Sequence, residues 1–324
     1  MINQSTEFIS ALNDKNVAAI KQVAKADLHN HFVLGGNRDY IKNKTGFNIL
    51  PIGHTLHSMD EMHDWTNKNI GNRFESREMR QLLIEATFIQ AKQDGVAILE
   101  IGEDVWALGA FFDNDVDMLI DAFESAHKRI APNIELRLQI GMSRHCGTDY
   151  LLTCLEPFWG RKEFYSIDLY GNELAQPIEN FVPIYKKAKE HGLRLKAHIG
   201  EWGSAEDVIN GIKLLSLDEV QHGIAAAASD SAIDFLLKHQ VRLNITPTSN
   251  ILLGRVEHIK EHPIAKLYRA GVDVTINSDD ILIFNSDVSK EYLSLYTNNV
   301  LSAEELDSIR LNGLRKTEDI FYWR

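Results

Sequence analysis

Short apolar segments alternate with helix-like segments from residue 26 to residue 277, and this rhythm limits the folds that the chain can adopt. Eight of these segments have the length and the aliphatic composition of buried strands. They span residues 26–32, 96–101, 135–141, 165–170, 194–199, 219–222, 241–246 and 272–277. Most are followed by a helix, and strands that alternate with helices form parallel sheets. Eight such units in 324 residues predict an α/β fold, a closed (β/α)8 TIM barrel, so we expect residues 1–324 to form a single domain.

The segment between the first two strands is long for a connection. Residues 38–94 are mostly helical in pattern, and their apolar residues recur at helical spacing, as at Leu56, Met59, Met62 and Trp65. This pattern predicts a helical insertion, a lid over the mouth of a pocket. A second metal site is the alternative for its histidines, which are His54, His57 and His63. The amphipathic helix is the favoured interpretation.

The charge balance excludes several classes of partner. Lys and Arg number 34 against 46 Asp and Glu, which gives a formal net charge of −12. Such an acidic chain is a poor match for nucleic acid or an anionic membrane. No stretch approaches the roughly 18 unbroken apolar residues of a membrane span, and the N-terminus lacks a signal-peptide pattern. Because Cys146 and Cys154 are the only cysteines, we expect a reduced, cytoplasmic protein.

Polar side chains gather at the carboxyl ends of the predicted strands, where a barrel has its active site. His29 and His31 are two residues apart on the first strand and therefore share a face. His198 ends the fifth strand, and Glu201 follows after a turn at Gly200. Singly, each residue has an ordinary structural interpretation, such as a satisfied core histidine. Their common location at strand ends favours a shared site.

Two further strand ends add to this set. His222 closes the sixth strand, and Asp279 and Asp280 follow the eighth. Because the eighth strand of a closed barrel lies beside the first, Asp279 can approach the first two histidines. Three imidazoles and one carboxylate suit a catalytic Zn²⁺ that keeps a position for water. The candidate ligands from the residues alone are Asp279 and three of the four histidines at strand ends, which are His29, His31, His198 and His222.

Six stretches, taken in order, resemble the adenosine deaminase family of the amidohydrolase superfamily. They are DLHNH at 27–31, SIDLYGNE at 166–173, AHIGEWGS at 197–204, HG at 222–223, TPTSN at 246–250 and NSDD at 277–280. As a set these motifs are highly specific, and they span most of the predicted barrel. The helical insertion after the first strand also resembles the lid of that family.

The resemblance implies a zinc-dependent hydrolase that removes the amino group of a 6-aminopurine, with adenosine the first expectation and inosine and ammonia the products. One Zn²⁺ per chain would be bound by His29, His31, His198 and Asp279. Glu201 would protonate ring nitrogen N1 while metal-activated water attacks C6, and His222 would orient that water. Asp279 would thus belong to the catalytic set together with Glu201 and His222. Asp280 would hydrogen-bond N7, and the backbone N–H of Gly171 would reach N3.

Two positions depart from the family pattern. The acidic residue that often follows the second histidine by two positions is replaced by Val33. The arginine that usually follows the Glu-aliphatic pair at the end of strand two is replaced by Gly102. Both changes concern the sugar end of the substrate. Adenine, an N6-substituted adenine, AMP and a pterin-like heterocycle therefore stay open as alternative substrates.

Two other functions compete with this interpretation. A two-metal amidohydrolase commonly uses a carboxylated lysine at the end of strand four, but this strand ends at Tyr170-Gly171 without one. A non-catalytic purine-binding sensor could lose Glu201 or His222, yet both are present. We therefore expect a small-molecule substrate, with a homo-oligomer left open.

Overall fold

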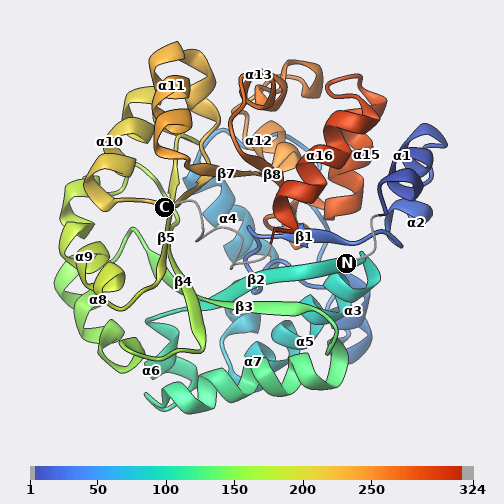
Figure 1. The fold of residues 1–324 in the computed structure, drawn as a ribbon. Helices are drawn as coiled ribbons and strands as arrows, with labels where there is room; N and C mark the ends of the chain where they lie inside the picture. The colour runs from blue at the N-terminus through green and yellow to red at the C-terminus, as the bar shows by residue number, and fades with distance from the viewer. Residues whose placement is uncertain (1–3, 316–324) are drawn as a thin grey trace.

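Eight parallel strands form the centre of the fold in a computed structural model that describes residues 4–315 (Figure 1). The strands are β1 (Lys25–Asp27), β2 (Val96–Asp104), β3 (Glu135–Ser143), β4 (Phe164–Tyr170), β5 (Arg194–Ile199), β6 (Glu219–His222), β7 (Arg242–Ile245) and β8 (Val274–Ile276). They lie in sequence order, each parallel to the next. The predicted α/β TIM barrel is confirmed.

The barrel closes between β8 and β1 through single contacts instead of a full ladder. The backbone N–H of Leu28 donates to Asn277 Oδ1 at 2.8 Å. Asn30 forms an isolated parallel bridge with Asp279. The sheet is therefore nearly closed, and its seam runs beside the predicted site.

The first strand is shorter than the sequence predicts. Residues 26–32 were expected to be extended, with His29 and His31 on one strand face, but β1 ends at Asp27 and both histidines follow it. The reason is a change of partner, because residues 28–30 pair with the segment after β8 instead of with β2. The carbonyl of His31 then accepts two backbone N–H groups, from residues 34 and 35, and so begins a turn. The histidines are positioned by this seam and turn, not by strand alternation.

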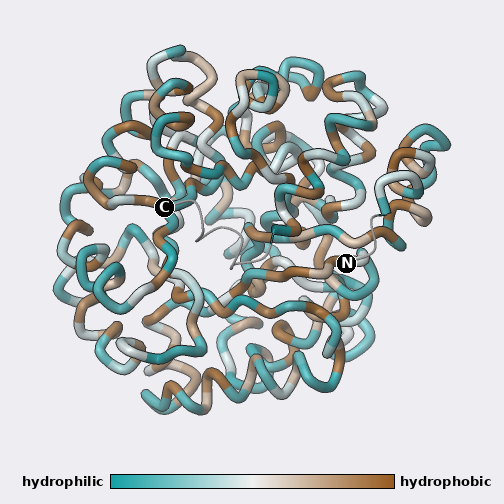
Figure 2. The backbone as a smooth tube through the Cα atoms, viewed as in Figure 1, coloured by the Kyte–Doolittle hydropathy of each residue, from teal (hydrophilic) through white to brown (hydrophobic). Residues whose placement is uncertain are grey.

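Helices surround the strands, and hydrophobic and hydrophilic residues alternate along them, as expected of a one-sided burial pattern (Figure 2). They are α1 (Ser5–Asn13), α2 (Val17–Ile20), α3 (Arg38–Thr45), α4 (Met59–Asn69), α5 (Arg77–Gln93), α6 (Ala107–Phe111), α7 (Val116–Ile130), α8 (Thr148–Leu155), α9 (Val182–Glu190), α10 (Ala205–Leu215), α11 (Asp230–His239), α12 (Pro247–Leu252), α13 (Ile264–Arg269), α14 (Ile281–Phe284), α15 (Val288–Thr297) and α16 (Ala303–Gly313). Capping boxes at Ser204 and Ser302 begin α10 and α16. Within residues 4–315, no helix has both the length and the apolar character needed to cross a membrane.

The insertion after β1 contains α3, α4 and α5. Figure 1 shows α4 through the centre of the ring of strands. Met59, Met62, His63 and Thr66 of α4 line the cavity described below. The predicted amphipathic helix is thus present at the pocket, and its action as a lid stays a prediction. In the described part of the insertion, no three potential ligands are grouped closely enough for a second metal site.

Glu219 is the centre of a charged group buried inside the barrel. It pairs with Arg194 Nε at 2.5 Å and with Lys196 Nζ at 3.0 Å, and Lys196 Nζ also lies 2.7 Å from Glu100 Oε1. The Glu219 and Lys196 side chains are 1% and 0% exposed, so water screens these charges little. Burial alone would raise the pKa of Glu219, but the cations of Lys196, Arg194 and Arg242 hold it well below its ordinary value. The barrel interior is therefore partly ionic.

Replacing Glu219 by Gln is expected to lower the free energy of unfolding by about 3–5 kcal/mol near pH 7, because the substitution leaves buried cations without their counter-charge. The carboxylate stabilises the folded state fully above its ordinary pKa of 4.5, and this contribution is lost as pH falls below that value toward the depressed pKa. Urea unfolding at pH 7 and at acidic pH measures both effects. The exposed Glu257→Gln control should stay within about 0.5 kcal/mol of wild type, and an equal effect of the two substitutions would refute the prediction.

Candidate active site

Four ligand atoms converge at the carboxyl end of the barrel. The Nε2 atom of His198 lies 3.0 Å from Nε2 of His29 and 3.2 Å from Nε2 of His31. Asp279 Oδ1 lies 3.8 Å from the first of these two histidines and 3.6 Å from the second. The four residues come from the segments after β1 and β8 and from β5, which are far apart in the sequence. Three imidazole nitrogens and one carboxylate oxygen form a donor set typical of zinc.

The hydrogen bonds of Nδ1 in His29 and His198 show which nitrogen of each ring faces the cluster. His29 Nδ1 lies 3.1 Å from the carbonyl oxygen of Asn244, so it carries the proton and donates. His198 Nδ1 lies 3.3 Å from Asp168 Oδ1 and donates in the same way. The Nε2 atoms of both rings therefore face each other at 3.0 Å. Burial would lower the pKa of His198, but Asp168, Asp279 and Glu201 raise it, so this position favours a positive charge and the residues fit a metal ion.

Burial and nearby charges set the protonation states of the residues in this cluster. Burial lowers the pKa of His29 to about 3, so the ring is neutral and its lone pair is free. Burial would raise the pKa of Asp168, but its contacts with His198 lower the value to about 2. Asp168 is therefore ionised and orients the imidazole of His198.

Glu173 holds the turn that carries Glu201. Its carboxylate accepts the four backbone N–H groups of residues 200–203 at 2.6, 3.1, 2.8 and 3.0 Å. Gly200 has a φ of 73°, and a Cβ atom there would lie 2.4 Å from Val208 Cγ2. Only glycine fits this position without displacement of its neighbour. The turn is therefore fixed by a carboxylate anchor on one side and close packing on the other.

The side chain of Glu201 is buried beside His222. This side chain is 7% exposed, and its Oε1 has no hydrogen-bond partner and lies 3.5 Å from His222 Nε2. Burial, and then the nearby charge of Asp279, raise the pKa of Glu201 to about 8. The carboxyl group is therefore protonated at neutral pH. A buried acid of this kind suits proton transfer to a bound ligand.

A chain of hydrogen bonds reaches Nδ1 of His222, which also lies 3.0 Å from Thr246 Oγ1. The backbone N–H of Ile264 donates to His262 Nδ1 at 3.2 Å, so His262 Nε2 carries its proton and donates to Asn250 Oδ1 at 3.2 Å. The amide nitrogen of Asn250 then faces His222 Nδ1 at 3.2 Å and donates to it. Burial lowers the pKa of His222 well below its ordinary value, so the ring is neutral. Its Nε2 atom lies 3.5 Å from Glu201 Oε1.

A cavity of about 270 Å³ opens beside these groups. Its wall includes Gly171 after β4 and Asp280 after β8. Burial, and then the nearby Asp279 and Glu201, raise the pKa of Asp280 well above its ordinary value, and its Oδ1 has no hydrogen-bond partner. The residues that line the cavity include four carboxylic acids but no Lys or Arg.

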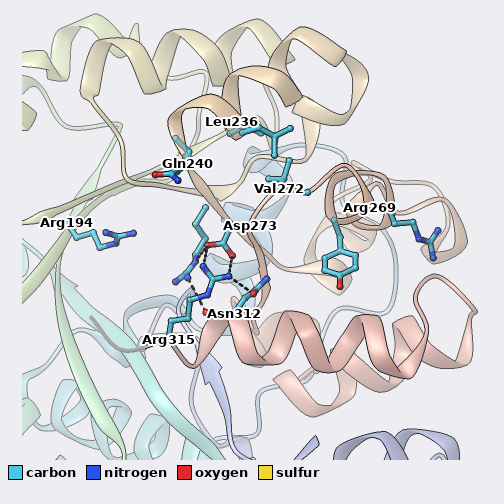
Figure 3. Close-up of a pocket in the computed structure, with 13 residues that line it drawn as sticks. Arg194, Leu236, Gln240, Arg269, Val272, Asp273, Asn312 and Arg315 are labelled. Atoms are coloured by element: carbon cyan, nitrogen blue, oxygen red, sulfur yellow. Dashed lines mark hydrogen bonds and ion pairs between the residues drawn. The ribbon is translucent and has the colours of Figure 1, made fainter. Parts of the chain in front are cut away.

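A larger cavity of about 930 Å³ lies at the opposite end of the barrel (Figure 3). Its arginines are paired with carboxylates, as Arg242 and Arg315 are with Asp273 at 3.1 and 3.2 Å. Arg269 pairs with Glu305 at 2.7 Å. These ion pairs lie toward the amino ends of the strands, away from the carboxyl ends that carry the histidine cluster.

Comparisons with known proteins agree with this geometry. The model of the adenosine deaminase family matches residues 65–318. A Treponema pallidum (strain Nichols) protein, proposed to be an adenosine/adenine deaminase, is 30% identical over 299 residues, which cover 91% of this chain and 100% of that protein. The chain belongs to the adenosine deaminase family. The expected resemblance is confirmed.

Solved structures of low sequence identity share the fold of this family member. An adenine deaminase from Arthrobacter aurescens has a TM-score of 0.77 and 22% identity, with 92% of this chain and 95% of that chain covered. An amidohydrolase from Burkholderia ambifaria with bound Zn has a TM-score of 0.77 and 18% identity, with 96% and 91% covered. Together with the family match, these findings identify the chain as a hydrolytic deaminase.

The structure of this deaminase gathers the residues singled out in the sequence. The cavity is lined by His31, Gly171, His198, Glu201, His222, Asp279 and Asp280, and His29 lies directly behind His198. Their individual roles stay predictions.

Sequence reasoning gave no role to several residues that orient this deaminase site. They are Asp168, Glu173, Asn250 and His262. Three of them lie within the matching motif stretches, but no spacing in the sequence indicates their partners. His262 lies outside those stretches.

Proposed function

We propose that this deaminase hydrolyses the C6–amino bond of a 6-aminopurine, with one Zn²⁺ per chain held by His29, His31, His198 and Asp279. The observation that carries the proposal is the convergence of these four ligand atoms beside a protonated Glu201. A zinc ion bound there lowers the pKa of a coordinated water toward about 7 and so supplies hydroxide at neutral pH.

The residues around this centre have complementary tasks in hydrolysis. Glu201 gives its proton to N1, which withdraws electrons from C6 as water oxygen adds to that carbon. His222 holds the attacking oxygen through its Nε2 proton, a state that the hydrogen bond from Asn250 supports. The Glu201 carboxylate then takes the proton of the new C6 hydroxyl and passes it to the amino group. The C6–N bond breaks, ammonia leaves, and the 6-oxopurine keeps a proton on N1.

Two further groups fit the purine ring acceptors. The protonated carboxyl group of Asp280 can donate to N7, and the backbone N–H of Gly171 can donate to N3. A phosphate monoester such as AMP is a poor match, because no Lys or Arg lines the cavity and four acidic side chains do. The free cysteines Cys146 and Cys154 accord with the proposed cytoplasmic location.

Ultraviolet absorbance with zinc-loaded protein tests the proposal on adenine, adenosine, N6-methyladenine and AMP in parallel, with ammonia measured alongside. We expect turnover of at least one unphosphorylated aminopurine, one ammonia released for each purine converted, and no turnover of AMP. Absence of turnover for the whole panel, with zinc bound, would contradict the proposal and favour a purine-binding sensor.

A further inference from the structure

Glu103 at the end of β2 has a carboxylate oxygen without a partner. Its Oε1 accepts the backbone N–H of Asp104 at 3.0 Å and lies 3.5 Å from Nη1 of Arg80. Its Oε2 is buried and has no hydrogen-bond partner, although Glu103 is 3% exposed and lines the cavity. An unpaired buried carboxylate oxygen is costly. The proposed catalytic steps leave this group unused, so the atom is available to a ligand donor.

The order of strands around the rim places Glu103 at a defined edge of the purine. In the proposed function N1 faces Glu201 after β5, N3 faces Gly171 after β4, and N7 faces Asp280 after β8. Along the perimeter of a purine, N9 lies between N3 and N7. Along the rim of the barrel, β3, β2 and β1 lie between β4 and β8 on the side away from β5. Glu103 on β2 therefore falls in the sector that receives N9.

A sugar attached to N9 would contact more of the cavity wall than a hydrogen atom at N9 does. The wall contributed by the segment after β1 and by α4 is mostly apolar and includes Val33, Leu34, Met59 and Met62. Ribose hydroxyl groups buried there would lose hydrogen bonds to water. The cavity, at about 270 Å³, is also below the usual lower limit of about 300 Å³ for ligand pockets. Both features favour a substrate without a sugar.

We propose that the substrate is a free 6-aminopurine base and that Glu103 selects it by accepting the hydrogen bond from N9–H. This inference rests on the proposed function, since the ring orientation is taken from it. A free base offers acceptors at N1, N3 and N7 and a donor at N9. Glu201, Gly171 and Asp280 supply donors to the three acceptors, and Glu103 Oε2 supplies the matching acceptor.

The Glu103→Gln variant tests this contact specifically. The donors from Asp104 and Arg80 hold the amide oxygen at the Oε1 position, so the amide NH₂ takes the Oε2 position and faces N9–H with a donor. Steady-state kcat/KM is measured for adenine, 9-methyladenine and adenosine with wild type, Glu103→Gln and the exposed control Glu257→Gln. 9-Methyladenine keeps the reacting ring and carries a methyl group in place of the N9 proton.

We expect wild type and Glu257→Gln to prefer adenine to both N9-substituted substrates. Glu103→Gln should lower kcat/KM for adenine about 10- to 100-fold, the usual range for a hydrogen bond to a charged group, with little change for 9-methyladenine. A wild-type preference for adenosine, or an equal loss on adenine and 9-methyladenine, would overturn the inference while the deaminase function stands. If Glu103→Gln does not fold, the ratio of wild-type kcat/KM for adenine to that for 9-methyladenine tests the inference.

A binding measurement separates failure of this inference from failure of the proposed function. Purine and 9-methylpurine have no amino group to lose, so calorimetry measures their binding to zinc-loaded protein without deamination. Tighter binding of purine to wild type, lost in Glu103→Gln, supports the contact even if no substrate is turned over. Equal binding of the two compounds to wild type refutes it.

Discussion

Replacing Glu201 with glutamine is expected to lower kcat by about 10²- to 10⁴-fold, the usual contribution of a positioned general acid. The carboxyl group of Glu201 is buried with a pKa of about 8, so it carries a proton at neutral pH. An amide of the same shape has no acidic proton to give to N1. The turn should survive, because Glu173 holds the backbone N–H of Glu201 and not its side chain. Single-turnover deamination rates of wild type and variant measure the loss.

Zinc content separates this catalytic effect from damage to the site. Glu201→Gln should bind as much zinc as wild type, because Glu201 is in neither group of potential metal ligands, His29–His198–His222 or His29–His31–Asp279. Glu206→Gln, on the exposed face of α10, is the matched control and should leave kcat unchanged. A fully active Glu201→Gln enzyme would show that another group supplies the proton.

Removal of the metal is expected to abolish deamination and to destabilise the fold. The Nε2 atoms of His29 and His198 then lie 3.0 Å apart without the metal ion that would bind both. A ligand at about 1,000 times its dissociation constant stabilises a protein by about 4 kcal/mol, so the metal-free protein should unfold at a clearly lower temperature. Plasma emission spectrometry should find one zinc per chain. Activity should vanish on chelation and return when zinc is added.

Two histidine variants provide the control for the metal prediction. His198→Ala removes the ligand nearest to both other imidazoles and should lose zinc and activity together. His258→Ala, whose side chain is 70% exposed, should keep both. A measured content near two zinc ions per chain would contradict the single centre and point to a two-metal amidohydrolase.

The sequence predicted the barrel because strands and helices are each indicated by residues that are close together in the chain. Buried parallel strands need short aliphatic segments, and their covering helices need caps such as those of Ser204 and Ser302. Polar residues at the ends of such segments, such as His198 and Asp279, can be recognised as candidate site residues from their position in the sequence alone. Even the wrong boundary of the first strand left this inference intact, because the ends of parallel strands meet on one rim.

The sequence by itself therefore determined the fold class, the family and the set of candidate ligands. The tertiary structure alone decided which atoms are paired and which are free. His222 Nδ1 is bonded through residue 250, and Glu103 Oε2 is left without a donor after Arg80 and Asp104 have taken Oε1. Hydrogen bonds depend on distances within about 3.5 Å between groups that are often far apart along the chain, so no spacing in the sequence encodes them.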